Sequence, residues 1–247
     1  MSKESATTGV VSELAGDVLR DTLARLACVR FSDSTLDEVL ELIVTLACET
    51  VTDADAGSLT LRRQGALATP HYSDEAVLAL DEVQYETGEG PCVQALAEGV
   101  VVHSDEGLDR WPELAERAQA AGIYSVLSSP LEVRGEVFAS LNLYSRARKF
   151  DEEARQLSAL FAGPAGTTFA NALAYAAAAK LNENLREAIA TREIIGEAKG
   201  ILMARQACTS DEAFDILRRA SQRTNRKLRD IAVELVSTTE SQQARKA

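Results

Sequence analysis

The sequence from Gly196 to Val236 reads GEAKGILMARQACTSDEAFDILRRASQRTNRKLRDIAVELV, and it says more about this chain than any other stretch. Between Arg218 and Arg229 it carries six basic side chains, in a protein whose net charge is −12. A basic cluster on an acidic chain marks a surface that meets a negatively charged partner. Charge alone leaves DNA, RNA and other anionic surfaces open as that partner.

The same stretch predicts three helical segments. The first is the end of a long helical region over residues 167–205. The second begins at Thr209, because Glu212 three residues later completes a capping box. Its apolar face is expected to contain Ala213, Phe214, Ile216, Leu217 and Ala220. The third begins near Lys227, with Asn225 as its capping residue. The basic cluster is therefore expected to belong to a folded module.

This module resembles the ANTAR family, which are bacterial RNA-binding modules for transcription antitermination. Three separated runs agree with the family in order and spacing: AKGILM, then DEAFDILR, then NRKLRDIA. The resemblance implies a surface that grips the loop of an RNA stem-loop in a nascent transcript, in the context of RNA polymerase. Binding then stabilises that hairpin at the expense of an overlapping terminator. The residues expected to bind RNA are Lys199, Gly200, Arg218, Arg219, Gln222, Arg223, Asn225, Arg226 and Lys227.

The chemistry of these residues suits RNA. Arginine bonds phosphates bidentately and stacks on bases, while glutamine and asparagine bond base edges. Gly200 in a helix interior costs about 1 kcal/mol relative to alanine, so it either lets another helix approach or leaves room for a base. A helix-turn-helix DNA binder also uses three short helices and a basic face. The alanine-rich helix that leads into this module fits that alternative less well.

The middle of the chain changes to short strands and turns between helices over residues 54–145. This order predicts an antiparallel sheet with helices on its faces. The runs GEGPCVQAL, WPELAERA, GIYSVLSSPLEV, GEVFASLNLYS and FDEEARQLSALFA resemble a GAF domain, a small sensory α/β module. The expected fold class is α+β: a GAF domain, a long connecting helix and a three-helix ANTAR bundle. This pairing resembles one-chain bacterial transcription regulators that are common in actinobacteria.

The expected domain boundaries are 1–30 for an N-terminal helical segment, 31–176 for the GAF domain, 177–190 for a coiled-coil-like connector, 191–240 for the ANTAR domain and 241–247 for a tail. Pro164 is expected to kink or restart the helix in which it lies. An approximate heptad seam in the long helix favours a homodimer. Its positions are Ala174, Ala178, Leu181, Leu185, Ala188, Arg192, Ile195, Lys199 and Leu202.

The sensor part offers several signals, and the sequence selects none of them. Cys92 follows Pro91 near a predicted helix start, where the helix dipole would favour a thiolate. It is therefore a candidate sensor, as a redox thiol or a bilin attachment point. His71 and His103 are candidate haem ligands. An unknown small ligand or a partner protein is the remaining input, and the sequence predicts no cofactor or metal.

Charge is divided unevenly along the chain. Residues 1–180 hold 14 basic and 28 acidic side chains, whereas residues 181–247 hold 12 basic and 10 acidic ones. The acidic part should repel nucleic acid, which confines polyanion binding to the C-terminal part. The sequence has no apolar run near 18 residues and no apolar core of a signal peptide at its start. With four widely spaced cysteines, this predicts a cytoplasmic protein with reduced thiols and no membrane contact.

Common catalytic motifs, including the Walker, GxSxG and HExxH patterns, are absent from the sequence. This favours a regulator over an enzyme. The alternative interpretation is a GAF protein that senses a small molecule or a redox change, and whose C-terminal helices serve only dimerisation.

Overall fold

The computed structural model describes residues 4–63, 65–104, 108–146 and 149–244. The chain divides into two compact units, Met1–Ala176 and Ala177–Ala247. Within the described residues, no helix is long and apolar enough to cross a membrane.

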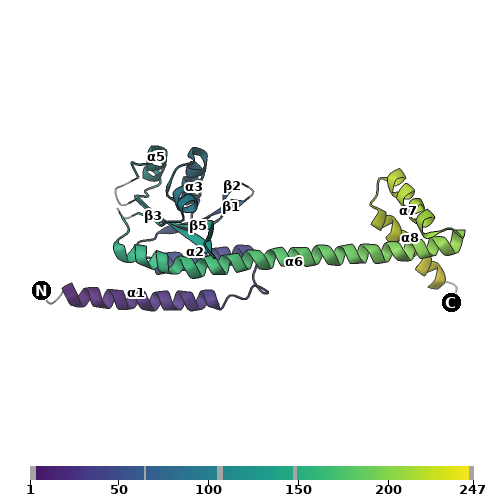
Figure 1. The fold of residues 1–247 in the computed structure, drawn as a ribbon, viewed down its shortest axis with the longest axis horizontal. Helices are drawn as coiled ribbons and strands as arrows, with labels where there is room; N and C mark the ends of the chain where they lie inside the picture. Colours follow the sequence, from purple (N-terminus) through teal and green to yellow (C-terminus); the bar gives the residue numbers. More distant parts are fainter. Residues whose placement is uncertain (1–3, 64, 105–107, 147–148, 245–247) are drawn as a thin grey trace. The chain divides into compact units, whose positions relative to one another are not determined.

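The first unit is built on a five-stranded sheet with the order β2-β1-β5-β4-β3, and every neighbouring pair of strands is antiparallel (Figure 1). The strands are β1 (Ala56–Arg63), β2 (Ala66–Tyr72), β3 (Val102–His103), β4 (Ser125–Val133) and β5 (Glu136–Ser145). The predicted α+β class and the predicted antiparallel sheet are confirmed.

Helices cover both faces of this sheet (Figure 1). One face packs against α2 (Leu36–Thr50) and the first part of α6 (Glu152–Gln206), and α1 (Glu4–Ala27) packs against α2. The other face packs against α3 (Glu75–Thr87), α4 (Pro91–Glu98) and α5 (Pro112–Ala120). Alternate residues of β5 serve the two layers, because side chains of a strand point to opposite faces. Leu141 and Leu143 join the α2 layer, and Tyr144 joins the α3 layer.

The helix α6 runs further than the sequence predicts. The predicted restart at Pro164 is wrong, because α6 is one helix that contains this proline. Proline removes the hydrogen bond to the carbonyl of Leu160. Leu160 is 61% exposed and Pro164 is exposed, so water can reach this carbonyl and the helix continues.

The second unit contains the end of α6, α7 (Ser210–Thr224) and α8 (Leu228–Ala244). Its core is small and apolar. The buried members are Ala198, Leu202, Ala213, Leu217, Ala232 and Val236. The predicted capping box is confirmed, because Thr209 Oγ1 accepts from the Glu212 N–H at 3.3 Å and Glu212 Oε2 accepts from the Thr209 N–H at 2.8 Å.

Asn225 does not cap the third helix, so that prediction is wrong. It ends α7 in the left-handed conformation, with φ 52°, and its N–H bonds to the carbonyl of Ser221. Asparagine tolerates this conformation better than most residues. The helix α8 instead begins at Leu228, directly after Lys227. The carbonyl of Lys227 accepts a hydrogen bond from the Asp230 N–H at 2.9 Å.

Candidate nucleic-acid interface and sensor site

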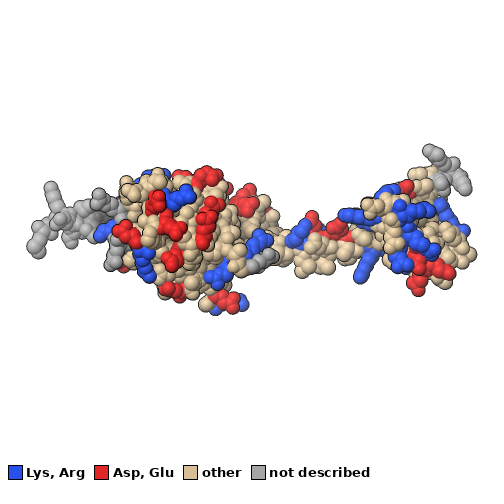
Figure 2. All heavy atoms as spheres, turned by 90° about the horizontal axis from the view of Figure 1, so that it is seen from above, with Lys and Arg blue, Asp and Glu red and all other residues tan. Residues whose placement is uncertain are grey.

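Six basic side chains of the second unit lie on α7, on the turn that follows it, and on the first turn of α8. We call them the basic surface: Arg218, Arg219, Arg223, Arg226, Lys227 and Arg229, all of which are exposed. Figure 2 shows many Lys and Arg side chains over the second unit, whereas Asp and Glu side chains are prominent over the first. The polar residues Gln222 and Asn225 are exposed within the same segment.

Three arginines of the basic surface form ion pairs within the unit. Arg218 lies 2.8 Å from Asp215, Arg226 lies 2.6 Å from Glu234, and Arg229 lies 3.4 Å from Glu187. Every partner is at least 44% exposed at its side chain. Such exposed pairs contribute about 0–1 kcal/mol, because water and salt screen them. The guanidinium groups can therefore exchange a carboxylate for a phosphate at low cost.

The turn between α7 and α8 is fixed by its own hydrogen bonds. Ser221 Oγ donates to the carbonyl of Arg226 at 2.5 Å, and the Arg226 N–H donates to the carbonyl of Ser221 at 3.2 Å. Together with the left-handed cap at Asn225, these bonds give the turn one backbone path. The turn thus presents Asn225, Arg226 and Lys227 from an ordered backbone.

Lys199 and Gly200 are neighbours on α6, but their surroundings differ. A Cβ on Gly200 would meet no atom within 4 Å, so no other helix of the described chain packs there. The space beside Gly200 is open to a partner. Lys199 is half-buried, and its Nζ atom lies 6.0 Å from the centroid of the Phe214 ring on α7.

Phe214 is the residue that sequence reasoning missed. It was expected in the core, but its side chain is 39% exposed, whereas the core residues Ala213 and Leu217 are 0% and 2% exposed. The signal was present in the spacing. Positions 213, 217 and 220 form one helical row, and position 214 lies 100° away from 213 around the helix axis.

In the first unit, a polar cluster fills the space between the sheet and α3. Asp81 is fully buried, and its carboxylate accepts hydrogen bonds from the Tyr144 hydroxyl and, at 2.9 Å, from Thr69. Burial, the largest cause, raises the pKa of Asp81 to about 6. The hydroxyl of Tyr85 donates to Thr60 at 2.9 Å, which extends the cluster along the sheet.

Two further sheet residues complete this polar cluster. Asn142 on β5 donates to Thr60 at 2.8 Å and to Ser58 at 3.2 Å. Ser128 is the cross-strand partner of Asn142, and its Oγ is buried without a hydrogen-bond partner among the described residues. A buried hydroxyl without a partner costs about 1–3 kcal/mol, so this cluster has unused hydrogen-bonding capacity.

Cys92 lies at the start of α4, but it is completely buried. Burial raises the pKa of its thiol well above the ordinary value, and the nearby Asp81 carboxylate acts in the same direction. Burial therefore opposes the thiolate expected at the helix start, because loss of hydration disfavours the charged form of the thiol. The Cys92 N–H donates to Gln84 Oε1 at 3.0 Å, and a Cβ on Gly90 would lie 2.3 Å from that oxygen.

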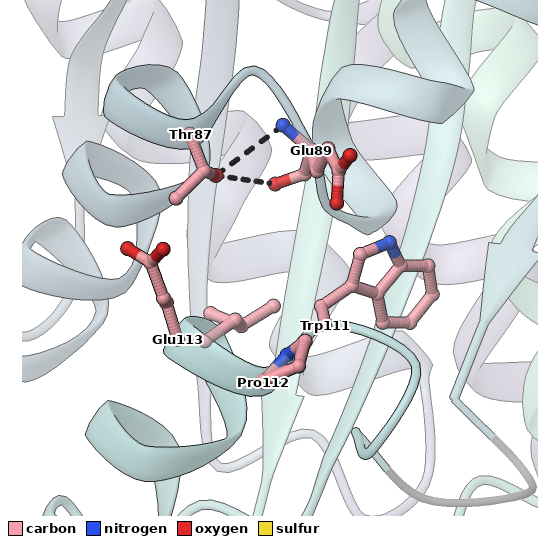
Figure 3. Close-up of a pocket in the computed structure, with 6 residues that line it drawn as sticks. Thr87, Glu89, Trp111, Pro112 and Glu113 are labelled. Atoms are coloured by element: carbon pink, nitrogen blue, oxygen red, sulfur yellow. Dashed lines mark hydrogen bonds between the residues drawn. The ribbon is translucent and has the colours of Figure 1, made fainter.

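A pocket of about 210 Å³ opens between the end of α3 and the start of α5. Figure 3 shows its lining, which includes the indole of Trp111 and the carboxylates of Glu89 and Glu113. The hydroxyl of Thr87 holds the loop, since it donates to the Glu89 carbonyl at 3.1 Å and accepts from the Glu89 N–H at 3.3 Å. Among the described residues, the lining contains two carboxylates and no basic residue, which disfavours an anionic ligand.

Comparison with known families identifies both units. A model of the GAF domain matches residues 33–170, more than half of the chain. The chain belongs to the GAF domain family. A model of the ANTAR domain matches residues 183–236. An ANTAR domain after a GAF domain is the architecture of an RNA-binding antitermination regulator with a sensor domain. A comparison with curated proteins finds no match.

Solved structures support the GAF fold. The GAF domain of a phosphoenolpyruvate-protein phosphotransferase from Coxiella burnetii is 19% identical, with a TM-score of 0.53, over 67% of this chain and 98% of that one. Free methionine-R-sulfoxide reductase from Neisseria meningitidis, solved with its substrate, is 18% identical, with a TM-score of 0.50, over 65% and 91%. At these identities the likeness shows the fold alone.

The two histidines of the GAF domain do not come together. His71 is on β2 and His103 is on β3, and these are the two outer strands of the sheet. Neighbouring strands are about 4.8 Å apart, so four steps separate the histidines by roughly 19 Å. One haem iron cannot be held by both. Among the described residues, no group of three or more His, Cys, Asp or Glu side chains could hold a metal ion.

In the ANTAR domain the nine predicted RNA-binding residues occupy two places. Lys199 and Gly200 lie on α6, and the other seven lie on the second half of α7 and the turn after it. The Lys199–Phe214 contact links these two places, because Arg218 follows Phe214 by one helical turn.

Proposed function

We propose that this protein is an RNA-binding regulator of transcription antitermination. Its ANTAR domain binds stem-loops in a nascent transcript and keeps the overlapping terminator from forming, so that RNA polymerase continues. The main support is the basic surface, which sits on a folded three-helix unit in an otherwise acidic chain. The nine residues from Lys199 to Lys227 named above make the RNA contacts. In this proposal the protein works in the cytoplasm and catalyses no reaction.

A homodimer is part of the proposal. Leu181, Leu185 and Ile189 on α6 are 59%, 53% and 57% exposed, and their spacing of four residues places them on one helix face. An apolar stripe of this kind is stabilised when a second copy covers it. Further along the predicted seam, Ile195 and Leu202 pack in the core of their own chain. The pairing therefore belongs to the connector, residues 177–190, and two ANTAR domains then face two RNA hairpins.

The GAF domain receives the signal in this proposal. Two observations support a ligand there: the buried polar cluster around Asp81, whose Ser128 hydroxyl has no hydrogen-bond partner in the described part of the chain, and the acidic pocket beside Trp111. A bound ligand alters how the two α6 helices pair, and so how the RNA surfaces are presented. The domain ranges 31–176 and 191–240 describe the two functional parts.

The test is binding of an RNA with two consecutive hairpins by the full chain. Fluorescence anisotropy at fixed salt is measured for this RNA, for the same stems with their loops replaced by a continuous duplex, and for a DNA duplex. Tight binding of the two-hairpin RNA alone supports the proposal. Equal affinity for the DNA would indicate a helix-turn-helix protein. No binding, with a dimer in solution, would favour helices that serve only dimerisation.

A readout of function follows in a purified transcription reaction. A template whose terminator overlaps the second hairpin is transcribed with and without the protein. Read-through that increases with the protein is expected. Binding without any change in read-through would contradict the antitermination step while leaving RNA binding intact.

A further inference from the structure

An aromatic side chain lies exposed among cations in the ANTAR domain. Phe214 is 39% exposed, although its neighbour Ala213 is fully buried. Exposing part of a phenylalanine ring forfeits burial that would stabilise the unit by about 25 cal/mol for each Å². An isolated exposed apolar residue is common on proteins. Here the ring also has a specific cationic neighbour, which points to use as a binding surface.

Two basic side chains flank this ring. Lys199 Nζ on α6 lies 6.0 Å from the ring centroid. Arg218 follows Phe214 by four residues on α7, so both side chains lie on the same helix face. The Arg218 side chain is 55% exposed. The surface therefore combines an aromatic ring with two basic side chains, Lys199 close to the ring and Arg218 on the same face of α7, which complements a nucleotide that has a flat base and an anionic phosphate.

Two acidic residues near the ring have partners within the unit, and Arg218 must exchange Asp215 for a phosphate, which an exposed pair allows at low cost. Asp215 pairs with Arg218 at 2.8 Å, and Glu212 is held by the capping box at Thr209. Asp211, one turn before Phe214, is exposed. Phosphate that approaches from the Lys199 and Arg218 side meets the two cations first.

We propose that Phe214 is a stacking platform for one unpaired base of the RNA loop, with Lys199 and Arg218 holding the adjacent phosphates. This rests on the proposed RNA-binding function and adds a specificity-determining residue to it. A base stacks on an aromatic ring through its π-face, so the contact selects unpaired loop nucleotides over paired stem nucleotides. The basic surface then supplies the salt-dependent part of binding.

The test compares three substitutions in the full chain: Phe214→Ala, Phe214→Leu and Phe214→Trp. The probe is a pool of two-hairpin RNAs with randomised loops, and then one RNA selected from it with the wild-type protein. We expect Phe214→Ala and Phe214→Leu to weaken binding roughly 5- to 150-fold, the range for loss of one stacked base. Phe214→Trp should keep wild-type affinity. Val233→Ala, at a 44% exposed apolar residue on α8, is the matched control.

An abasic scan of the selected RNA locates the stacked base. At one loop position, removal of the base should weaken wild-type binding and leave Phe214→Leu binding unchanged. In Phe214→Trp, the fluorescence of the new indole should be quenched by RNA, with wild-type protein, whose single Trp111 is buried in the GAF domain, as the baseline.

The outcomes separate this inference from the proposed function. If wild-type protein binds no member of the RNA pool, the proposed function fails. If it binds, and Phe214→Leu binds equally well at unchanged folding by circular dichroism, the stacking inference is overturned. A Phe214→Leu protein that loses affinity only because it no longer dimerises, as seen by sedimentation, would also overturn it and assign the ring to a contact between chains.

Discussion

The hydroxyl of Tyr144 on β5 donates a hydrogen bond to the carboxylate of Asp81 on α3, and both side chains are fully buried. This bond joins the sheet to the helix layer in the middle of the GAF core. An ionised carboxylate in such a place costs free energy, even with two hydroxyl donors, because little water reaches it. Burial therefore raises the pKa of this carboxyl group to about 6.

The stability of the GAF domain should depend on pH through Asp81. Folding raises its pKa from 3.8 to about 6, so the folded state holds the proton more tightly than the unfolded state. The free energy of unfolding then decreases as pH rises through this range. Between pH 5.5 and pH 8, wild-type protein should lose about 1 kcal/mol more stability than Asp81→Asn. Urea unfolding at both pH values, above the isoelectric point of 4.8, measures this. Identical pH dependence of the two proteins would exclude Asp81 as the group.

The cysteines should differ in reactivity in the order of their exposure. Cys28 is exposed, whereas Cys92 is buried with a raised pKa. Burial also raises the pKa of Cys48 to about 11. In native protein at pH 8, iodoacetamide should modify Cys28 first and Cys92 far more slowly, with a fast reaction at Cys92 only in denaturant; peptide mass spectrometry measures both rates. Equal alkylation rates at Cys28 and Cys92 would support the hypothesis that Cys92 is a reactive thiolate sensor.

The capping box at Thr209 should stabilise α7. Thr209→Ala removes the side-chain acceptor for the Glu212 N–H, and such a loss costs about 1 kcal/mol. Faster amide hydrogen exchange in α7, with no change in the GAF domain, is expected in the full chain. Thr35→Ala is the matched control, because Thr35 and Glu38 form the same box at α2. Thr35→Ala should speed amide hydrogen exchange in α2 alone. Faster exchange in α7 of this variant would contradict a local effect of the capping box.

The apolar stripe on α6 should control the oligomeric state. Leu185→Lys places a charge at a 53% exposed position of the stripe, which a paired interface would have to bury. Sedimentation should show a shift from dimer to monomer, with unchanged helix content. Ala190→Lys adds the same charge at an exposed position on another side of the helix and should stay dimeric. If both variants sediment like wild-type protein, the dimer forms elsewhere or does not form.

Removal of two arginines should weaken RNA binding in a salt-dependent way. The double variant Arg218→Ala/Arg226→Ala removes two phosphate contacts of the proposal. The slope of log affinity against log salt should become shallower by about one to two, and affinity should fall about tenfold at low salt. Arg62→Ala/Arg63→Ala removes the same charge from exposed positions of β1 and serves as control. A wild-type slope for Arg218→Ala/Arg226→Ala would contradict the assignment of the basic surface to RNA binding.

Local signals in the sequence were strong where one residue type has one structural use. The box at Thr209 and Glu212 predicted the start of α7, and Pro91 marked the predicted helix start at α4. In these places, backbone geometry depends on neighbours within four residues, which a sequence contains in full.

Predictions from the sequence were less accurate where packing between distant parts of the chain determines burial or conformation. Cys92 was placed at a helix start correctly, but its depth in the core, and hence its pKa, depends on packing against α3 and the sheet. Phe214 lies one position away from the row of Ala213 and Leu217, and only the packing of α7 shows that this row is the buried one. Asn225 suits both a helix start and a helix end, and only the turn geometry decided between them.

The contact of Gln84 with the start of α4 has a consequence for the motions of the GAF domain. Gln84 Oε1 holds the Cys92 N–H, and the space it uses exists only because Gly90 has no side chain. The Cys92 sulfur is buried, so solvent reaches it when this hydrogen bond breaks and α4 moves away from α3. The alkylation rate at Cys92, relative to that of a free thiol, then reports the equilibrium between closed and open forms of this core. A ligand that binds the closed form would slow alkylation of Cys92. The alkylation rate of this native thiol can therefore be used to screen for ligands of the GAF domain.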